Sequence, residues 1–351
     1  TTVGILTDKY RASQDIEDLE KAVKIADWLI ENKQDGSGAY IGPTGDYTSV
    51  IYPAKSIMEL MYEEKALAES EREDRDVWQE RYDRHFNSVK KAMDNLVRLN
   101  GDLHTEGQIT LEDGAVACSA TQLSEFALMF PEGSQERETY TAAAKLYLDY
   151  HEALEQRLIP DSRMNGGSLR FWEAQYDTLV RANPNNMMNS PHGWTAWSIY
   201  ALFNMYELTG DQEYLRRGMN TMGSCAQLMG FDGNLYWAFI ADPQIQATLT
   251  VQKPGDTSEY GEKADRQAVL GETYVDMITD WWKTPEGQNV GGYYGQGGSC
   301  DNDVHEIFKA MEETVLTKAY VTETEEGVYE TYNCSVSEKD GLLTVTADEN
   351  E

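Results

Sequence analysis

Apolar residues recur along most of the chain at the three- and four-residue spacing of an amphipathic helix. The first clear run spans residues 15–32, with Leu19, Val23 and Ala26 on one face, and it ends before a glycine-rich turn. The same spacing predicts further helices over residues 53–67, 116–129, 135–158, 212–229, 266–282 and 303–317. It also predicts two helices that end near residues 100 and 208. The chain is therefore expected to be mainly α, with roughly ten helices.

Short turns alternate with long segments between these predicted helices. The long segments are rich in glycine, aromatic and acidic residues, and they cover residues 36–47, 101–114, 168–193 and 286–302. Such alternation is typical of repeated helical hairpins whose long loops collect at one end.

The end of the chain has a different pattern. Residues 320–346 alternate apolar and polar side chains and contain Glu-Gly and Asp-Gly turns, which predicts a few antiparallel strands. We therefore divide the chain into a helical domain, 1–319, and a short β segment, 320–351. The pattern leaves open whether that segment is complete or belongs to a larger β domain.

Composition narrows the class of protein. A hydrophobic content of 40% supports a sizeable core, and 61 acidic against 29 basic residues give a net charge of −32. This charge disfavours binding to nucleic acid and to anionic membrane surfaces, and no run of about eighteen apolar residues predicts membrane insertion. We interpret the acidic surface as that of an exported protein, extracellular or periplasmic.

Candidate chemistry is most concentrated in residues 168–197, which hold three Trp, two Arg, two carboxylates and a His. The Asn-Pro-Asn-Asn sequence at 183–186 favours turns over helix, so these groups are expected on a loop that leads into a helix. Trp197 has the spacing of a core residue. Trp172, Asn189, His192 and Trp194 are better explained together as ligand-binding residues.

The chain has only five histidines. His192 lies among Asn, Pro, Gly and Trp residues, where a purely structural role is less common, and His104 precedes a segment that contains two acids. His85 and His151 lie in predicted helices among charged residues and are expected to be exposed. His305 remains open to either interpretation.

Several motifs resemble those of known helical carbohydrate-active enzymes: HTEGQITLEDG, RFWEAQYD, NSPHGWTAW and TGDQEYL. They are similar to the (α/α) toroids of the six-hairpin glycosidase-like superfamily and of the toroid polysaccharide lyases. The resemblance covers residues 15–320. It implies a toroid of helical hairpins, a cleft lined by Trp and Tyr that stack on sugar rings, and a small flanking β domain.

Hydrolysis of a glycosidic bond requires one acid to protonate the leaving oxygen and one carboxylate to activate water or attack carbon. The candidates in the predicted loops are Glu106, Asp113, Glu173 and Asp177. An acid in so acidic a chain is more often a surface or capping residue. The acidic loops nevertheless favour a glycoside hydrolase by a small margin.

Elimination at a uronate is the near alternative. It requires a group that neutralises the sugar carboxylate and a base that removes the neighbouring proton. Arg170, Tyr176, Asn189 and His192 supply that set within one segment, although Arg170 could instead pair with a nearby acid. A non-catalytic glycan-binding protein is a third alternative.

An oligo- or polysaccharide is the expected partner in all three cases. The expected substrate-binding residues are His104, Arg170, Trp172, Asn189, Trp194, Trp237, Tyr293 and Tyr294. The sequence contains no HExxH or EF-hand pattern, so we expect no metal in the site and no cofactor. A structural calcium ion at Asp301, Asn302 and Asp303 is an unspecific alternative.

Overall fold

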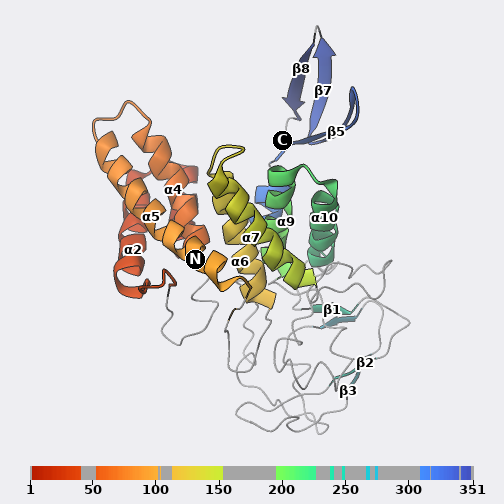
Figure 1. Ribbon diagram of the computed structural model, residues 1–351, viewed down its shortest axis with the longest axis horizontal. Coiled ribbons are helices and arrows are strands. Elements are labelled where there is room, and N and C mark those ends of the chain that lie inside the picture. The colour runs from red at the N-terminus through yellow and green to blue at the C-terminus, as the bar shows by residue number, and fades with distance from the viewer. Residues whose placement is uncertain are drawn as a thin grey trace. The chain divides into compact units, whose positions relative to one another are not determined.

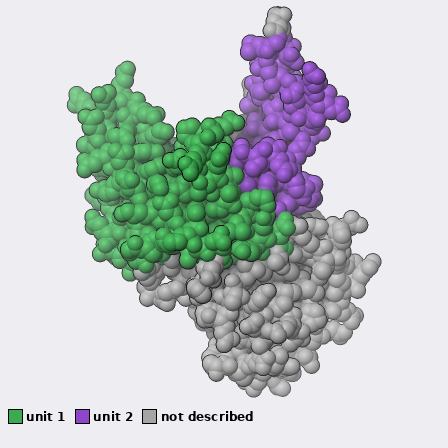
Figure 2. Space-filling model, viewed as in Figure 1, with its two compact units in different colours: residues 1–156, 168–188 green, residues 157–167, 189–351 purple. Residues whose placement is uncertain are grey.

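A computed structural model describes most of the helices and the C-terminal strands of the chain. The described residues are 2–40, 53–101, 103, 113–152, 195–226, 238–240, 247–249, 266–268, 273–275, 309–316, 318–339 and 341–348. By their contacts, the residues divide into two compact units (Figure 2). Unit 1 comprises Thr1–Gln156 and Ser168–Met188, and unit 2 comprises Arg157–Gly167 and Asn189–Glu351.

The described part of unit 1 contains three pairs of helices that are consecutive in the sequence and pack against each other (Figure 1). The pairs are α1 (Thr2–Ser13) with α2 (Ile16–Lys33), α4 (Pro53–Ala68) with α5 (Arg75–Leu99), and α6 (Asp113–Leu128) with α7 (Gln135–His151). Short connections join the members of each pair, which makes them antiparallel hairpins.

Local sequence signals set the ends of these helices. Asp15 caps α2 by accepting a hydrogen bond from the Glu17 N–H at 3.0 Å, and Ser134 caps α7 through the Arg137 N–H at 3.2 Å. At the other end of α5, Asn100 adopts a left-handed conformation with φ of 50°. Asparagine tolerates this conformation better than most residues, so it can terminate the helix there.

The core of unit 1 forms where the apolar faces of these helices meet. Four aromatic rings from α5, α6, α7 and the α6–α7 turn stack in a cluster of Phe86, Phe126, Phe130 and Tyr140, with centroids 4.9 to 5.9 Å apart. Phe126 is fully buried at its centre. Burial of such rings is the main source of stabilisation for a helical hairpin, because hydrogen bonding alone gives little net gain.

Unit 2 is organised around α9 (Thr195–Thr209), which packs against α10 (Gln212–Ala226). Residues 197–206 of α9 are all buried, so this helix is central rather than amphipathic. Gly218 of α10 lies against Phe203 of α9, and a Cβ at Gly218 would come within 2.8 Å of the ring. The glycine therefore allows the close approach of these two helices.

Short strands complete the described part of unit 2. β1 (Ala238–Ile240) pairs with β4 (Thr273–Val275), and β2 (Ala247–Leu249) pairs with β3 (Arg266–Ala268), both antiparallel. A helical segment ends in a π-helical turn, η4 (Glu312–Leu316). It is followed by two hairpins, β5 (Tyr320–Glu325) with β6 (Val328–Tyr332) and β7 (Cys334–Lys339) with β8 (Leu342–Ala347).

The Tyr320 ring attaches the first of these hairpins to α9. Its centroid lies 5.6 Å from that of Phe203 and 5.7 Å from that of Tyr206, and its hydroxyl donates to the carbonyl of Thr314. Burial raises the pKa of Tyr320, so the phenol stays neutral and keeps its proton for this hydrogen bond. The C-terminal strands are thereby anchored to the helices of unit 2.

The mainly α class, the helical hairpins and the small antiparallel β segment at the C-terminus are confirmed. The helix predicted over 266–282 is wrong at 266–268 and 273–275, which form strands β3 and β4. Thr273, Tyr274 and Val275 are residues that favour strands, and here this propensity outweighs the helical spacing of the apolar residues. Closure of the hairpins into a toroid, and the domain boundary at residue 320, stay predictions.

Candidate functional site

Almost all residues of the predicted site lie outside the described residues. They are His104, Glu106, Arg170, Trp172, Glu173, Tyr176, Asp177, Asn189, His192, Trp194, Trp237, Tyr293 and Tyr294. The calcium alternative at Asp301, Asn302 and Asp303 also lies outside them. The structure therefore describes the helices that precede and follow the predicted site segments.

Asp113 is the exception, because it is the first residue of α6. The sequence predicted a loop position for it and a helix start a few residues later. Aspartate is common in the first turn of a helix, where a negative charge is stabilised by the helix dipole. This position therefore fits a structural role as well as a catalytic one.

In unit 1, the helix termini that adjoin the predicted loops all lie at the same end of the helical hairpins. Arg98 near the end of α5 donates to the carbonyl of Ser37, just after α2, at 3.0 Å. Tyr147 near the end of α7 donates to the carbonyl of Leu96 in α5 at 2.9 Å. Because α4 and α6 run antiparallel to their partners, both helices start at this same end.

Buried polar side chains lie close to the start of α4. Lys55, Ser56 and Glu59 are 4%, 5% and 8% exposed, and the Lys55 ammonium forms an ion pair with the Glu59 carboxylate. Charged residues are rarely buried unless they are paired, so the ion pair explains how both are tolerated. Helix α6 adds a second set of fully buried polar residues, Ser119, Thr121, Gln122 and Ser124.

In unit 2, α9 begins at Thr195, directly after the segment that contains His192 and Trp194. Trp197 is 8% exposed, which confirms that it is a core residue. Ser198 is buried one position further along. This helix start therefore gives the predicted ligand-binding segment a rigid connection to the core of unit 2.

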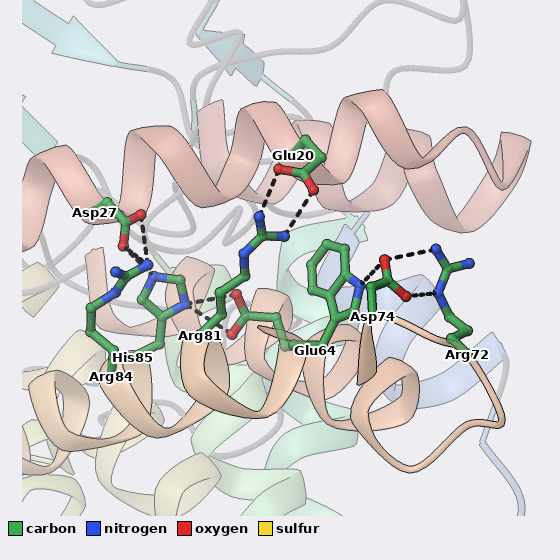
Figure 3. Close-up of polar contacts among 9 residues, drawn as sticks. Glu20, Asp27, Glu64, Arg72, Asp74, Arg81, Arg84 and His85 are labelled. Carbon is green, nitrogen blue, oxygen red and sulfur yellow. Dashed lines mark hydrogen bonds and ion pairs between the residues drawn. The ribbon is translucent and has the colours of Figure 1, made fainter. Parts of the chain in front are cut away.

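A cluster of ionisable groups in the described residues lies elsewhere, between α2, α4 and α5 (Figure 3). His85 of α5 contacts Glu64 of α4 through Nδ1 at 2.8 Å and Asp27 of α2 through Nε2 at 3.1 Å. Arg84 donates to Asp27 at 2.7 Å, and Arg81 of α5 forms a bidentate pair with Glu20 of α2 at 2.9 and 3.0 Å.

A histidine between two carboxylates has the composition of a catalytic centre, but its burial excludes that role. His85 and Glu64 are 0% exposed, and a general acid or base must come within hydrogen-bond distance of a substrate. Asp74, at the N-cap position of α5, accepts from Arg72 at 2.8 Å and from the Trp78 indole at 3.1 Å but makes no capping hydrogen bond with its side chain, so it is an ion-pairing residue. We conclude that this cluster is structural.

The prediction that His85 and His151 are exposed is wrong, since both are fully buried. The sequence did contain a signal for their burial. His85 lies seven residues after Trp78 and four before Val89, on the buried face of α5, and His151 lies four after Tyr147 on the buried face of α7. Their charged sequence neighbours belong to the opposite faces of these helices.

The described residues contain neither a cluster of metal ligands nor a membrane-spanning helix. Within them, no group of three or more His, Cys, Asp or Glu side chains is arranged to hold a metal ion. None of the described helices is both long and apolar enough to cross a membrane.

The sequence matches no protein-family model, and no curated protein matches it significantly. A solved structure of a polysaccharide lyase is similar to this chain with a TM-score of 0.38 and 16% sequence identity. The match covers 68% of this chain and 38% of the lyase chain, so this chain spans well under half the length of that protein.

Proposed function

We propose that the protein is a carbohydrate-active enzyme that cleaves glycosidic bonds in an oligo- or polysaccharide, with hydrolysis as the preferred reaction. The proposal rests on the concentration of Trp, Tyr, His and acidic residues in the long segments before α6 and α9. In unit 1, the starts of α4 and α6 also lie at one end of the helical hairpins, which supports a site built from loops on a rigid scaffold.

In the hydrolase, Glu106, Asp113, Glu173 and Asp177 are the candidates for the acid and for the base or nucleophile. Trp172, Trp194, Trp237, Tyr293 and Tyr294 would stack on sugar rings, while His104, Arg170 and Asn189 would form hydrogen bonds with hydroxyl groups or a carboxylate. The protein would act outside the cell or in the periplasm, without a cofactor.

Elimination at a uronate is the second candidate, because one segment contains Arg170, Tyr176, Asn189 and His192. Arg170 and Asn189 would neutralise the uronate carboxylate, and Tyr176 or His192 would remove the adjacent proton. The strong negative charge of the chain works against an anionic substrate unless these cationic groups are concentrated around it.

The test is to incubate the protein with neutral and uronate-containing glycans while following new reducing ends and the absorbance of an unsaturated uronate. Reducing ends without absorbance are the result expected for hydrolysis. Both signals together would contradict hydrolysis and indicate elimination. Binding without either signal would contradict both enzymatic functions and favour a glycan-binding protein.

Variants then assign the residues. We expect Glu106→Gln or Glu173→Gln to lower the cleavage rate roughly 100-fold or more, if the residue is the general acid or base. Glu132→Gln, in the exposed turn between α6 and α7, is the matched control and should keep full activity. For elimination, Tyr176→Phe is compared with Tyr150→Phe, because Tyr150 is 40% exposed on α7.

A further inference from the structure

The buried His85 contacts a carboxylate with each of its two ring nitrogens. Nδ1 lies 2.8 Å from both Oε1 and Oε2 of Glu64, and Nε2 lies 3.1 Å from Oδ1 of Asp27. Carboxylate oxygens only accept hydrogen bonds when they are ionised, so each ring nitrogen must carry a hydrogen to interact favourably. Neutral histidine has one N–H, whereas the imidazolium ion has two.

A neutral His85 with a proton on Glu64 would be the alternative arrangement. A protonated carboxyl group donates from one oxygen, and its second oxygen would then direct lone pairs at the ring nitrogen. Nδ1 instead forms its hydrogen bond with Oε2 at 2.8 Å, and Oε1 lies 2.8 Å from Nδ1 without a hydrogen bond of its own, as the second oxygen of an ion-paired carboxylate. The geometry therefore favours the ion pair.

The surrounding charges are balanced only when His85 is protonated. Three acids face the cluster: Glu20 and Asp27 from α2, and Glu64 from α4. From α5 come Arg81, Arg84 and the Tyr82 phenol, whose pKa is raised by burial and by nearby acids including Glu64. The three acids match two arginines and one imidazolium. In the described residues, no other hydrogen bond or ion pair is made by the Glu64 carboxylate.

We propose that His85 is a structural imidazolium, protonated at neutral pH, that joins α2, α4 and α5, and that unit 1 therefore becomes less stable as the pH rises. Loss of the proton would leave two buried or partly buried carboxylates facing a ring with a single N–H. An unpaired buried charge is costly, so the loss should open the contact between these three helices.

The pKa shifts agree with this direction. Burial opposes the charge on His85, but hydrogen bonds to Asp27 and Glu64 outweigh it and raise the pKa of His85. Burial also raises the pKa of Glu64, while the hydrogen bond with His85 opposes this. A group with a raised pKa in the folded state contributes stability that is complete below its unfolded pKa, about 6.5 for histidine, and is lost once the pH passes the folded pKa.

The direct test is NMR of the imidazole nitrogens in the full chain labelled with ¹⁵N-histidine. His85 is assigned among the five histidines by the signal that disappears in His85→Gln. At pH about 8, above the usual pKa of histidine, we expect two protonated ring nitrogens for His85. A neutral ring at that pH, with one protonated nitrogen, would overturn the proposal.

The second test is the pH dependence of unfolding for the wild type and for Glu64→Gln. In the wild type, the unfolding equilibrium constant of unit 1 should rise up to tenfold per pH unit between the unfolded and folded pKa values of His85. Glu64→Gln removes the charge that holds the proton, so His85 should titrate at lower pH and this rise should become smaller.

Lys90→Gln is the matched control, because it removes one partner of an exposed ion pair with Asp94 on the same helix. It should retain the wild-type pH dependence. An equal pH dependence in Glu64→Gln and the wild type would contradict the proposal.

Discussion

The helices of unit 1 and the C-terminal strands β5–β8 have similar regularity but very different burial. The described core of unit 1 includes fully buried aromatic, aliphatic and even charged side chains, such as Phe126, Leu60 and Glu64. In β8, by contrast, all six residues are exposed, and Leu342 is 69% exposed. The strands contribute mainly Tyr320 and Cys334 to the buried residues.

This difference indicates that regular secondary structure alone does not determine the free energy of unfolding of a region in this chain. The strands pair through backbone hydrogen bonds within each hairpin, but a two-stranded hairpin in water is only marginally stable without burial. The helices of unit 1 gain their stability from packing between hairpins. Substitutions in the two regions should therefore have effects of very different size.

Phe126→Ala should have the largest effect. Phe126 is fully buried, and its ring contacts those of Phe86, Phe130 and Tyr140. Removal of the ring loses its transfer free energy and leaves a cavity, so we expect unit 1 to lose about 3–5 kcal/mol of unfolding free energy. Urea unfolding followed by circular dichroism measures this. A loss below about 1 kcal/mol would contradict the assigned core.

Gly38→Ala should have the next largest effect. Gly38 has a φ of 98°, and a Cβ there would lie 2.2 Å from the carbonyl oxygen of Lys91. The strained backbone and the clash with the main chain of α5 both oppose the substitution. We expect the free energy of unfolding to fall by about 2 kcal/mol. Gly36→Ala, where a Cβ would meet nothing within 4 Å, is the control in the same turn. Equal unfolding free energies would argue against this packing.

Ser134→Ala should have a moderate effect. The Ser134 side chain caps α7 by accepting from the Arg137 N–H. Loss of a capping side chain leaves that N–H without its partner and costs about 1 kcal/mol. Thermal unfolding should show a small decrease in Tm, and Ser134→Asp, which retains a capping oxygen, should restore it. A Ser134→Asp variant as unstable as the alanine would contradict capping.

Val345→Thr should have the smallest effect. Val345 is 48% exposed in β8 and pairs with Val336 of β7. Threonine has the same shape and a similar preference for strands, so the free energy of unfolding should change by no more than about 0.5 kcal/mol. A large loss would show that β8 is covered in solution, which would remove the contrast between the two regions.

The sequence predicts helices well where a continuous apolar stripe is flanked by caps. The predicted runs 15–32 and 53–67 agree closely with α2 and α4. α1 was not predicted, because its buried face includes the polar Thr7, whose hydroxyl donates to the carbonyl of Val3 at 2.9 Å. The local hydrogen bond makes this side chain compatible with burial, which an apolar pattern does not show.

Buried polar groups are likewise difficult to predict from sequence. His85 is stabilised in the core by Asp27 and Glu64, which are 58 and 21 positions away in the chain. The charged sequence neighbours of His85 suggested an exposed position, whereas its spacing from Trp78 and Val89 matches the buried face of α5. Its partners come from two other helices and become apparent only in the fold. Most of the candidate site stays a prediction, because its residues lie in segments outside the described ones, where no helical periodicity fixes side-chain positions.

The central claim is that the protein cleaves glycosidic bonds, and the most direct measurement is mass spectrometry of products from defined oligosaccharides. We predict fragments whose summed mass exceeds that of the substrate by one water molecule, because hydrolysis adds water across the bond. Fragments that sum to the substrate mass would contradict hydrolysis and establish elimination. Intact oligosaccharides, with binding still measurable, would contradict enzymatic cleavage of any kind.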